Sequence, residues 1–121
     1  MNVFDASALL AYLRGEAGSE VVRPELERGG VCGAANWSEV AQKVRASGAD
    51  WELARSLLLS FDLAIEPVLV PDAEDAAAMW QRGSGLSLAD RLCLALAERL
   101  GATAWTADAQ WGDHPRASQI R

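Results

Sequence analysis

The sequence predicts an α/β fold in which helices flank a central parallel sheet. Short apolar runs recur along the chain, and segments with the periodicity of amphipathic helices separate them. Strands that alternate with helices form a parallel sheet through right-handed crossovers, with helices on both faces. The chain has 121 residues, half of them hydrophobic, and no repeat or linker, which predicts a single domain over residues 1–121.

Five short segments are expected to form the strands; the first four are mainly apolar and bounded by polar or turn residues, and the fifth is a last short strand at the end of the sequence. They are residues 1–5, 31–35, 64–70, 102–106 and 117–121. The third segment contains Pro67, which has no backbone N–H to donate to a neighbouring strand. That segment is therefore predicted to lie at an edge of the sheet.

Six segments between the strands are expected to be helical. They are residues 7–14, 19–29, 36–47, 50–59, 72–82 and 87–100. The last has the clearest pattern, with leucines at four-residue steps from Leu88 to Leu100 and Gly101 as a C-terminal stop.

Charge and cysteine content limit the possible functions. Seventeen acidic and eleven basic residues give a net charge of −6, which argues against nonspecific nucleic-acid binding through bulk charge. A nucleic-acid enzyme stays compatible with this charge if some of the acids bind metal ions. No apolar stretch approaches the roughly 18 residues of a membrane span. Cys32 and Cys93 lie in separate apolar segments, which predicts buried free thiols and a cytoplasmic protein.

Four acidic residues are the main candidates for chemistry, because each lies where an expected strand ends or an expected helix starts. They are Asp5, Glu39, Asp90 and Asp108. In an α/β protein such positions gather at one edge of the sheet, where ligand sites form. Carboxylates at one site repel one another unless cations intervene, and they are suitable ligands for Mg²⁺ or Mn²⁺. The pattern predicts a metal-dependent enzyme that acts on phosphate.

Each acid also has a purely structural interpretation. Asn36 with Glu39, and Ser87 with Asp90, fit capping boxes at helix N-termini. The first acid of the set fits a helix cap and the last fits a turn residue. For any one acid alone, capping is the favoured explanation, whereas four such acids at one predicted edge would be a coincidence.

Four segments resemble, in order and spacing, the acidic motifs of PIN-domain nucleases. They are residues 3–10 with Asp5, 36–40 with Glu39, 86–97 with Asp90 and 105–108 with Asp108. One such motif is weak, but four in order are specific, and the resemblance covers the whole chain. Length and motif style are most similar to the VapC-type toxins of bacterial toxin–antitoxin pairs.

The resemblance implies a PIN-like three-layer fold with strand order 3-2-1-4-5 and cleavage of RNA that depends on Mg²⁺ or Mn²⁺. It maps Asp5, Glu39, Asp90 and Asp108 onto the metal-binding catalytic acids, and Ser7 and Thr106 onto supporting polar positions. It further implies a homodimer and a VapB-like antitoxin, which packs a helix against the toxin and presents a basic side chain near the acids. The alternative from another class is a catalytically silent PIN fold that acts as an RNA- or protein-binding module.

Two residues after the fourth motif have open roles. Asp113 is near enough in sequence to be a fifth acid, although the segment Trp111-Gly112-Asp113 departs from the family motif. His114, the only histidine, is expected in a surface loop before Pro115, with a contact to the site or to RNA as the alternative.

The five tryptophans are expected to pack rather than to bind RNA. Trp51 and Trp80 are expected in the core or an interface, and Trp105 in a buried strand. Trp37 and Trp111 flank the acidic motifs, where stacking on RNA bases is the less favoured alternative.

Overall fold

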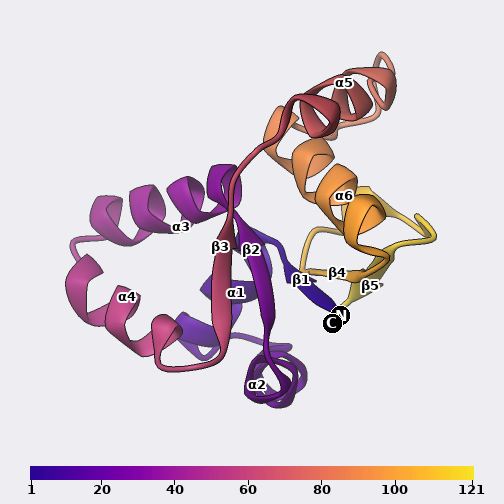
Figure 1. The fold of residues 1–121 in the computed structure, drawn as a ribbon. Coiled ribbons are helices and arrows are strands. Elements are labelled where there is room, and N and C mark those ends of the chain that lie inside the picture. The colour runs from indigo at the N-terminus through magenta and orange to yellow at the C-terminus, as the bar shows by residue number, and fades with distance from the viewer.

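Five parallel strands form one sheet in the order β3-β2-β1-β4-β5 (Figure 1). The computed structural model describes residues 1–121. The strands are β1 (Asn2–Phe4), β2 (Gly30–Gly33), β3 (Leu63–Glu66), β4 (Thr103–Thr106) and β5 (Ala117–Gln119). The predicted fold class and strand order are therefore confirmed.

Six α-helices and one 3₁₀ helix connect the strands. They are α1 (Ala6–Arg14), α2 (Ser19–Arg28), α3 (Ala34–Ala46), α4 (Trp51–Leu59), α5 (Val70–Ala78), α6 (Leu88–Leu100) and η1 (Ala109–Trp111). Gly101 ends α6 in the left-handed conformation, at φ 61°, as its position in the sequence predicted. No helix is both long and apolar enough to span a membrane.

The sheet separates two hydrophobic clusters, one on each face. Phe4 and Cys32 pack with α1, α2, α3 and α4, whereas Val3 and Val31 pack with α6. This alternation follows from the two-residue repeat of a strand, which points successive side chains to opposite faces. The result is the three-layer arrangement of Figure 1.

Three element boundaries differ from those expected. Helix α3 begins at Ala34, two residues before Asn36, because strand β2 is only four residues long and two alanines follow it. Helix α5 begins at Val70, with Pro71 in its first turn, and ends at Ala78. Strand β3 ends at Glu66, so Pro67 follows the strand, although the predicted edge position of that strand is confirmed.

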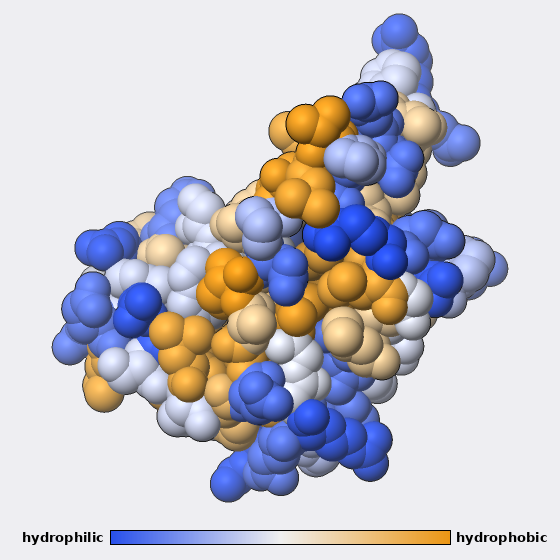
Figure 2. All heavy atoms as spheres, in the orientation of Figure 1, coloured by the Kyte–Doolittle hydropathy of each residue, from blue (hydrophilic) through white to orange (hydrophobic).

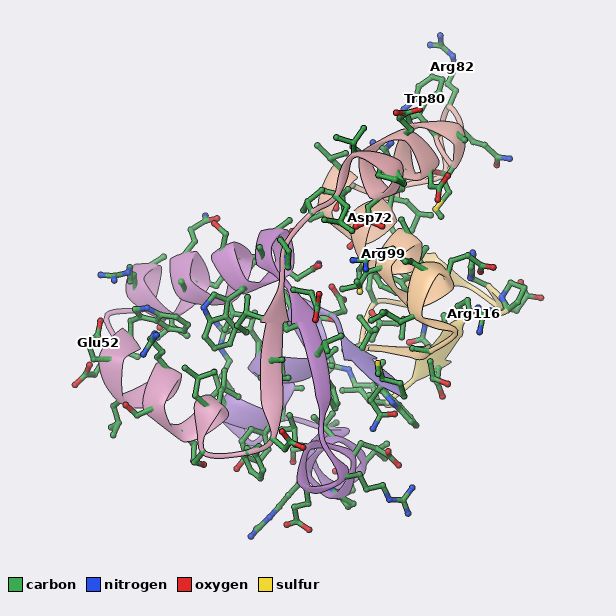
Figure 3. The ribbon with its side chains drawn as sticks, viewed as in Figure 1. Glu52, Asp72, Trp80, Arg82, Arg99 and Arg116 are labelled. Carbon is green, nitrogen blue, oxygen red and sulfur yellow. The ribbon has the colours of Figure 1, made fainter.

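Helix α5 and the loop 79–87 form a projection, called the arm below, beside the N-terminal end of α6 (Figure 1). At its base Asp72 accepts hydrogen bonds from Arg99 of α6, at 2.8 Å from Nε and 3.2 Å from Nη2. Figure 3 shows these two side chains pointing toward each other. The contact therefore joins the start of α5 to the end of α6.

Most tryptophans pack as expected. Trp51 is buried and makes an edge-to-face contact with Trp37, with ring centroids 5.2 Å apart. Trp111 is buried too, and Trp37 is partly buried against the core cluster that contains Trp51. Trp80 is 55% exposed on the arm, so of the two positions expected for it, core or interface, the core is excluded.

Candidate active site

Asp5 lies at the centre of the carboxyl edge of the sheet, directly after the central strand β1. It is 2% exposed and caps helix α1 by accepting a hydrogen bond from the backbone N–H of Ala6 at 2.8 Å. Its backbone N–H donates to the carbonyl of Trp105 at 3.0 Å, which extends the pairing of β1 with β4. Asp5 is thus both a cap and a buried carboxylate at the position where α/β proteins form their sites.

Two hydroxyl groups orient the Asp5 carboxylate. Ser7 Oγ and Thr106 Oγ1 donate to Asp5 Oδ2 at 2.7 and 2.8 Å. Each hydroxyl also accepts a backbone N–H, from Ala107 at 2.9 Å and from Asp108 at 3.0 Å respectively. Because both partners of each hydroxyl are fixed, the orientation of the carboxylate is fixed as well, which fits the supporting role expected for Ser7 and Thr106.

Asp90 lies in the first turn of α6 and forms the expected capping box. Ser87 Oγ accepts the N–H of Asp90 at 3.1 Å, and Asp90 Oδ2 accepts the N–H of Ser87 at 2.9 Å. The box uses one carboxylate oxygen of Asp90. Its structural role is therefore real, and the charge of the side chain is still available to the site.

Glu39 lies half-buried in the second turn of α3, beside the other two acids. Burial and the negative charges of Asp5 and Asp90 raise its pKa, and the positive charge of Lys43 opposes them. Burial also raises the pKa of Asp5; its hydroxyl partners lower it in part, and the charge of Asp90 raises it further. Asp5, Glu39 and Asp90 thus form one electrostatically coupled cluster.

Asp108 is connected to this cluster through Thr106. Its backbone N–H donates to Thr106 Oγ1, the same hydroxyl that donates to Asp5. Its side chain caps η1 by accepting the N–H of Gln110 at 2.9 Å. The structure therefore places the fourth acid at the rim of the site, in the turn that follows β4.

The two residues with open roles lie in the segment after η1. Asp113 is exposed. His114 is partly buried, and its Nδ1 accepts the backbone N–H of Arg116 at 3.1 Å, which gives the ring a structural role in this turn. The two cysteines are free and buried as expected, and burial raises the pKa of both thiols, so they remain protonated.

Asn36 is the residue of this site that sequence reasoning assigned wrongly. It was expected to cap α3, but the helix begins before it, and the side chain is 1% exposed inside the site. Its Nδ2 donates to the carbonyl of Ala89 at 3.2 Å and to Asp5 Oδ1 at 3.5 Å. The polar residue type in an apolar stretch was the available signal, and capping was the simpler explanation of it.

The acids fit a divalent cation in charge and in ligand type. The four ion pairs of the molecule all lie away from Asp5, Glu39, Asp90 and Asp108. The carboxylates that repel one another here thus have no basic partner in an ion pair. In the arrangement present, no three acidic, imidazole or thiol groups are close enough to hold a metal ion on their own. Water ligands would complete the shell of such an ion, as Mg²⁺ usually requires.

Comparison with known families assigns the fold. The family model described as "PIN domain" matches residues 3–116. The chain belongs to the PIN domain family. No curated protein matches it significantly.

Two solved structures share the architecture of this PIN domain. A toxin–antitoxin complex from Klebsiella pneumoniae matches with a TM-score of 0.82 and 17% identity, over 100% of this chain and 98% of that chain. VapC20 of Mycobacterium tuberculosis, described as a sarcin–ricin-loop-cleaving toxin, matches with a TM-score of 0.71 and 19% identity, over 93% of this chain and 92% of that chain. At these identities the likeness concerns the fold.

Proposed function

We propose that this PIN domain is a metal-dependent RNA endonuclease and the toxin of a VapBC-type toxin–antitoxin system. The observation that carries the proposal is the coupled cluster of Asp5, Glu39 and Asp90 at the carboxyl edge of the sheet, with no basic partner in an ion pair. Support also comes from the two structural neighbours, which are described as a toxin–antitoxin complex and as an RNA-cleaving toxin.

Asp5, Glu39, Asp90 and Asp108 would hold Mg²⁺ or Mn²⁺, either directly or through water. When bound, such an ion supplies a water that is nucleophilic at neutral pH and stabilises the leaving oxygen of a phosphodiester. Ser7 and Thr106 keep the Asp5 carboxylate in one orientation, so that it meets the ion without losing side-chain freedom. A cation is also needed to bring RNA to this edge, because the net charge of the chain is −6.

The test is cleavage of a labelled single-stranded or looped RNA by purified protein that has been freed of any partner. We expect cleavage in Mg²⁺ or Mn²⁺, and none in excess chelator or with Asp5→Asn. Undiminished cleavage in chelator would overturn the proposal. Metal-independent binding of RNA or protein, without cleavage, would favour the alternative, a catalytically silent PIN module. The observation that supports this alternative is that no three ligand groups lie close enough to hold a metal ion on their own.

We also propose a small cognate antitoxin as the partner. An apolar groove of about 240 Å³ lies between the C-terminal ends of α1 and α3 and the helix α4, and Leu53 and Leu57 flank it in an exposed position. The apolar face of a partner helix would cover these leucines. The acids lie toward the N-terminal ends of α1, α3 and α6, away from this groove, so a separate extension of the partner would carry a basic side chain to them. Purification of the chain from the native host under mild conditions should also recover a small protein that contains basic residues. The proposal would be contradicted if the chain is recovered alone and if its expression is harmless although the purified enzyme is active.

A second exposed apolar surface favours a homodimer. Val68, Leu69 and Val70 precede and begin α5, and each is more than 40% exposed. Trp80, in the loop of the arm, and Leu88, the first residue of α6, are more than half exposed as well. Figure 2 shows hydrophobic side chains gathered at the base of the arm. Exposed apolar surface of this kind marks protein–protein contacts, and a second copy of the chain is the proposed occupant.

The location proposed for the protein is the cytoplasm.

A further inference from the structure

Asn36 joins three parts of the site that are far apart in the sequence. The amide group belongs to α3, one of its acceptors is the carboxylate after β1, and the other is the carbonyl of Ala89 in α6. An amide NH₂ group has two hydrogens to donate, and here each is directed to a different element. Because Ala89 directly precedes Asp90, one side chain fixes the spacing between two acids that lie 85 positions apart in the chain.

The local backbone leaves room for this amide. A Cβ on Gly33, at the end of β2, would lie 3.1 Å from Asn36 Oδ1 and 3.4 Å from Leu96 Cδ2. Gly33 has φ −67° and ψ 147°, which any residue can adopt, so the backbone conformation does not require glycine here. The close approach of the Asn36 side chain is the reason that the structure offers for glycine at this position.

The same amide is a poor choice for stability alone. Its Oδ1 is buried without a hydrogen-bond partner in the protein. A buried carbonyl oxygen left without a partner costs about 1–3 kcal/mol, whereas an apolar side chain of similar size at a helical position has no such cost. A residue that weakens the fold while it joins two functional elements is expected to serve function.

We propose that Asn36 is a positioning residue that sets the distance between Asp5 and Asp90 and thereby the affinity of the site for its divalent cation. The inference rests on the proposed function, because it concerns the same acids. Asn36 itself contacts neither RNA nor a metal ion in this proposal; it acts through the carboxylate of Asp5 and through the first turn of α6. Partners of metal ligands that act in this way change metal affinity or activity by roughly 10- to 100-fold when they are removed.

The experiment compares Asn36→Leu with Asn2→Leu. Asn2 is a matched control, because its side chain also joins distant elements. Its Nδ2 donates to Glu25 Oε2 at 2.9 Å, and its Oδ1 accepts the indole N–H of Trp105 at 3.0 Å. Asn2 lies at the opposite edge of the sheet, away from the acids. In Asn36→Leu, backbone amides of residues 86–93 should exchange with solvent faster, and the Mn²⁺ concentration at the midpoint of the thermal shift should rise roughly 10- to 100-fold. The turnover number should fall and the KM for RNA should stay unchanged. Asn2→Leu should change none of these and only lower the melting temperature.

The outcomes separate this inference from the proposed function. If wild type shows neither a Mn²⁺ shift nor cleavage, the proposed function fails, and amide exchange in residues 86–93 still decides the role of Asn36. If Asn36→Leu changes only the melting temperature, with exchange and Mn²⁺ midpoint as in wild type, Asn36 is merely structural. Gly33→Ala is a second variant, which keeps Asn36 but displaces its amide. It should change the amide exchange of residues 86–93 and the Mn²⁺ midpoint in the same direction as Asn36→Leu, by a smaller factor. If neither variant changes these two quantities, the inference is overturned.

Discussion

At the scale of single residues, Asp90 has a capping role and a charged role that one substitution can separate. Asn at this position keeps an oxygen for the Ser87 N–H and removes the negative charge. Asp5 and Glu39 have raised pKa values in the folded chain. Such acids contribute stability below their unfolded pKa, and this contribution is lost as the pH rises through the folded pKa.

The negative charge of Asp90 is one of the causes that raise these two pKa values, because it repels the charged forms of Asp5 and Glu39. Asp90→Asn removes this repulsion, so the variant should be at least as stable as wild type at neutral pH without metal. Wild type should gain about 1.4 kcal/mol at a Mn²⁺ concentration ten times the dissociation constant, because the ion binds only the folded state. For a domain of this size the gain corresponds to a melting shift of about 5 °C. The variant should lose most of this shift and the cleavage activity.

Ser87→Ala is the control for this prediction. It removes the acceptor for the Asp90 N–H without changing a charge, so it should lower stability by about 1 kcal/mol and leave the Mn²⁺ shift intact. A thermal-shift titration of the three proteins decides the matter. If wild type and Asp90→Asn respond to Mn²⁺ alike, Asp90 is only a cap.

The same scale shows what the sequence could and could not predict about the site. The positions of Asp5 and Asp108 after strands were predictable, because each follows a short, mainly apolar run bounded by polar residues. The Ser87 and Asp90 capping box was predictable from local spacing alone. The role of Asn36 was not, because its burial depends on contact with Ala89, 53 positions further along the chain.

At the scale of elements, the ion pair between Asp72 and Arg99 holds the arm to α6. Asp72 is 3% exposed. Burial by itself raises its pKa, but the hydrogen bonds from Arg99 and from the N–H of Leu69, together with the Arg99 charge, lower it below its ordinary value. An acid with a lowered pKa contributes stability above its unfolded pKa, and the contribution is lost as the pH falls through the folded pKa.

Asp72→Asn should thus be less stable than wild type at pH 7, and the difference should shrink as the pH falls below about 4, near the ordinary Asp pKa of 3.8. Urea unfolding at a series of pH values from 7 to 3 measures this. Glu98→Gln is the control, since the ion pair of Glu98 with Arg116 is exposed and should contribute little. A difference for Asp72→Asn that stays constant down to pH 3 would show that its charge is not what holds the arm.

The elements themselves could be predicted further than their ends. Alternation of strands and helices predicted the sheet, because it follows from local chemistry. Pro67 led to the correct edge position of β3, although it lies one residue beyond the strand and therefore does not cause that position. The starts of α3 and α5 were not predictable to the residue, since the chain before each offers no polar side-chain cap. The placement of the arm could not be predicted, because its side-chain contacts with α6 join residues 15 and 27 positions apart: Arg91 donates to the carbonyl of Ala76, and Arg99 donates to Asp72.

At the scale of the whole molecule, two exposed apolar surfaces lie on opposite sides of the sheet. One flanks the groove beside α4 and the other lies at the base of the arm (Figures 1 and 2). Helix α4 belongs to the hydrophobic cluster on one face of the sheet, whereas α5 packs with α6 on the other. Two separate apolar surfaces would allow the proposed antitoxin and the proposed second copy of the chain to bind at the same time.

Two substitutions of matched exposure test this division. Leu53 beside the groove is 69% exposed and Val70 at the start of α5 is 71% exposed, so a glutamate at either position should cost little stability. Val70 begins a helix, where a negative charge is favourable. Val70→Glu should give a monomer in sedimentation experiments and still recover the antitoxin, because only the arm surface is changed.

Leu53→Glu should do the reverse, with loss of the antitoxin and retention of the dimer. Each variant is thus the control for the other, and equal melting temperatures would show that neither acts through unfolding. If Val70→Glu sediments like wild type at the same concentration, the arm is not the dimer surface. If both variants lose the antitoxin to the same extent, the partner contacts both surfaces and the assignment of one surface to each occupant is wrong.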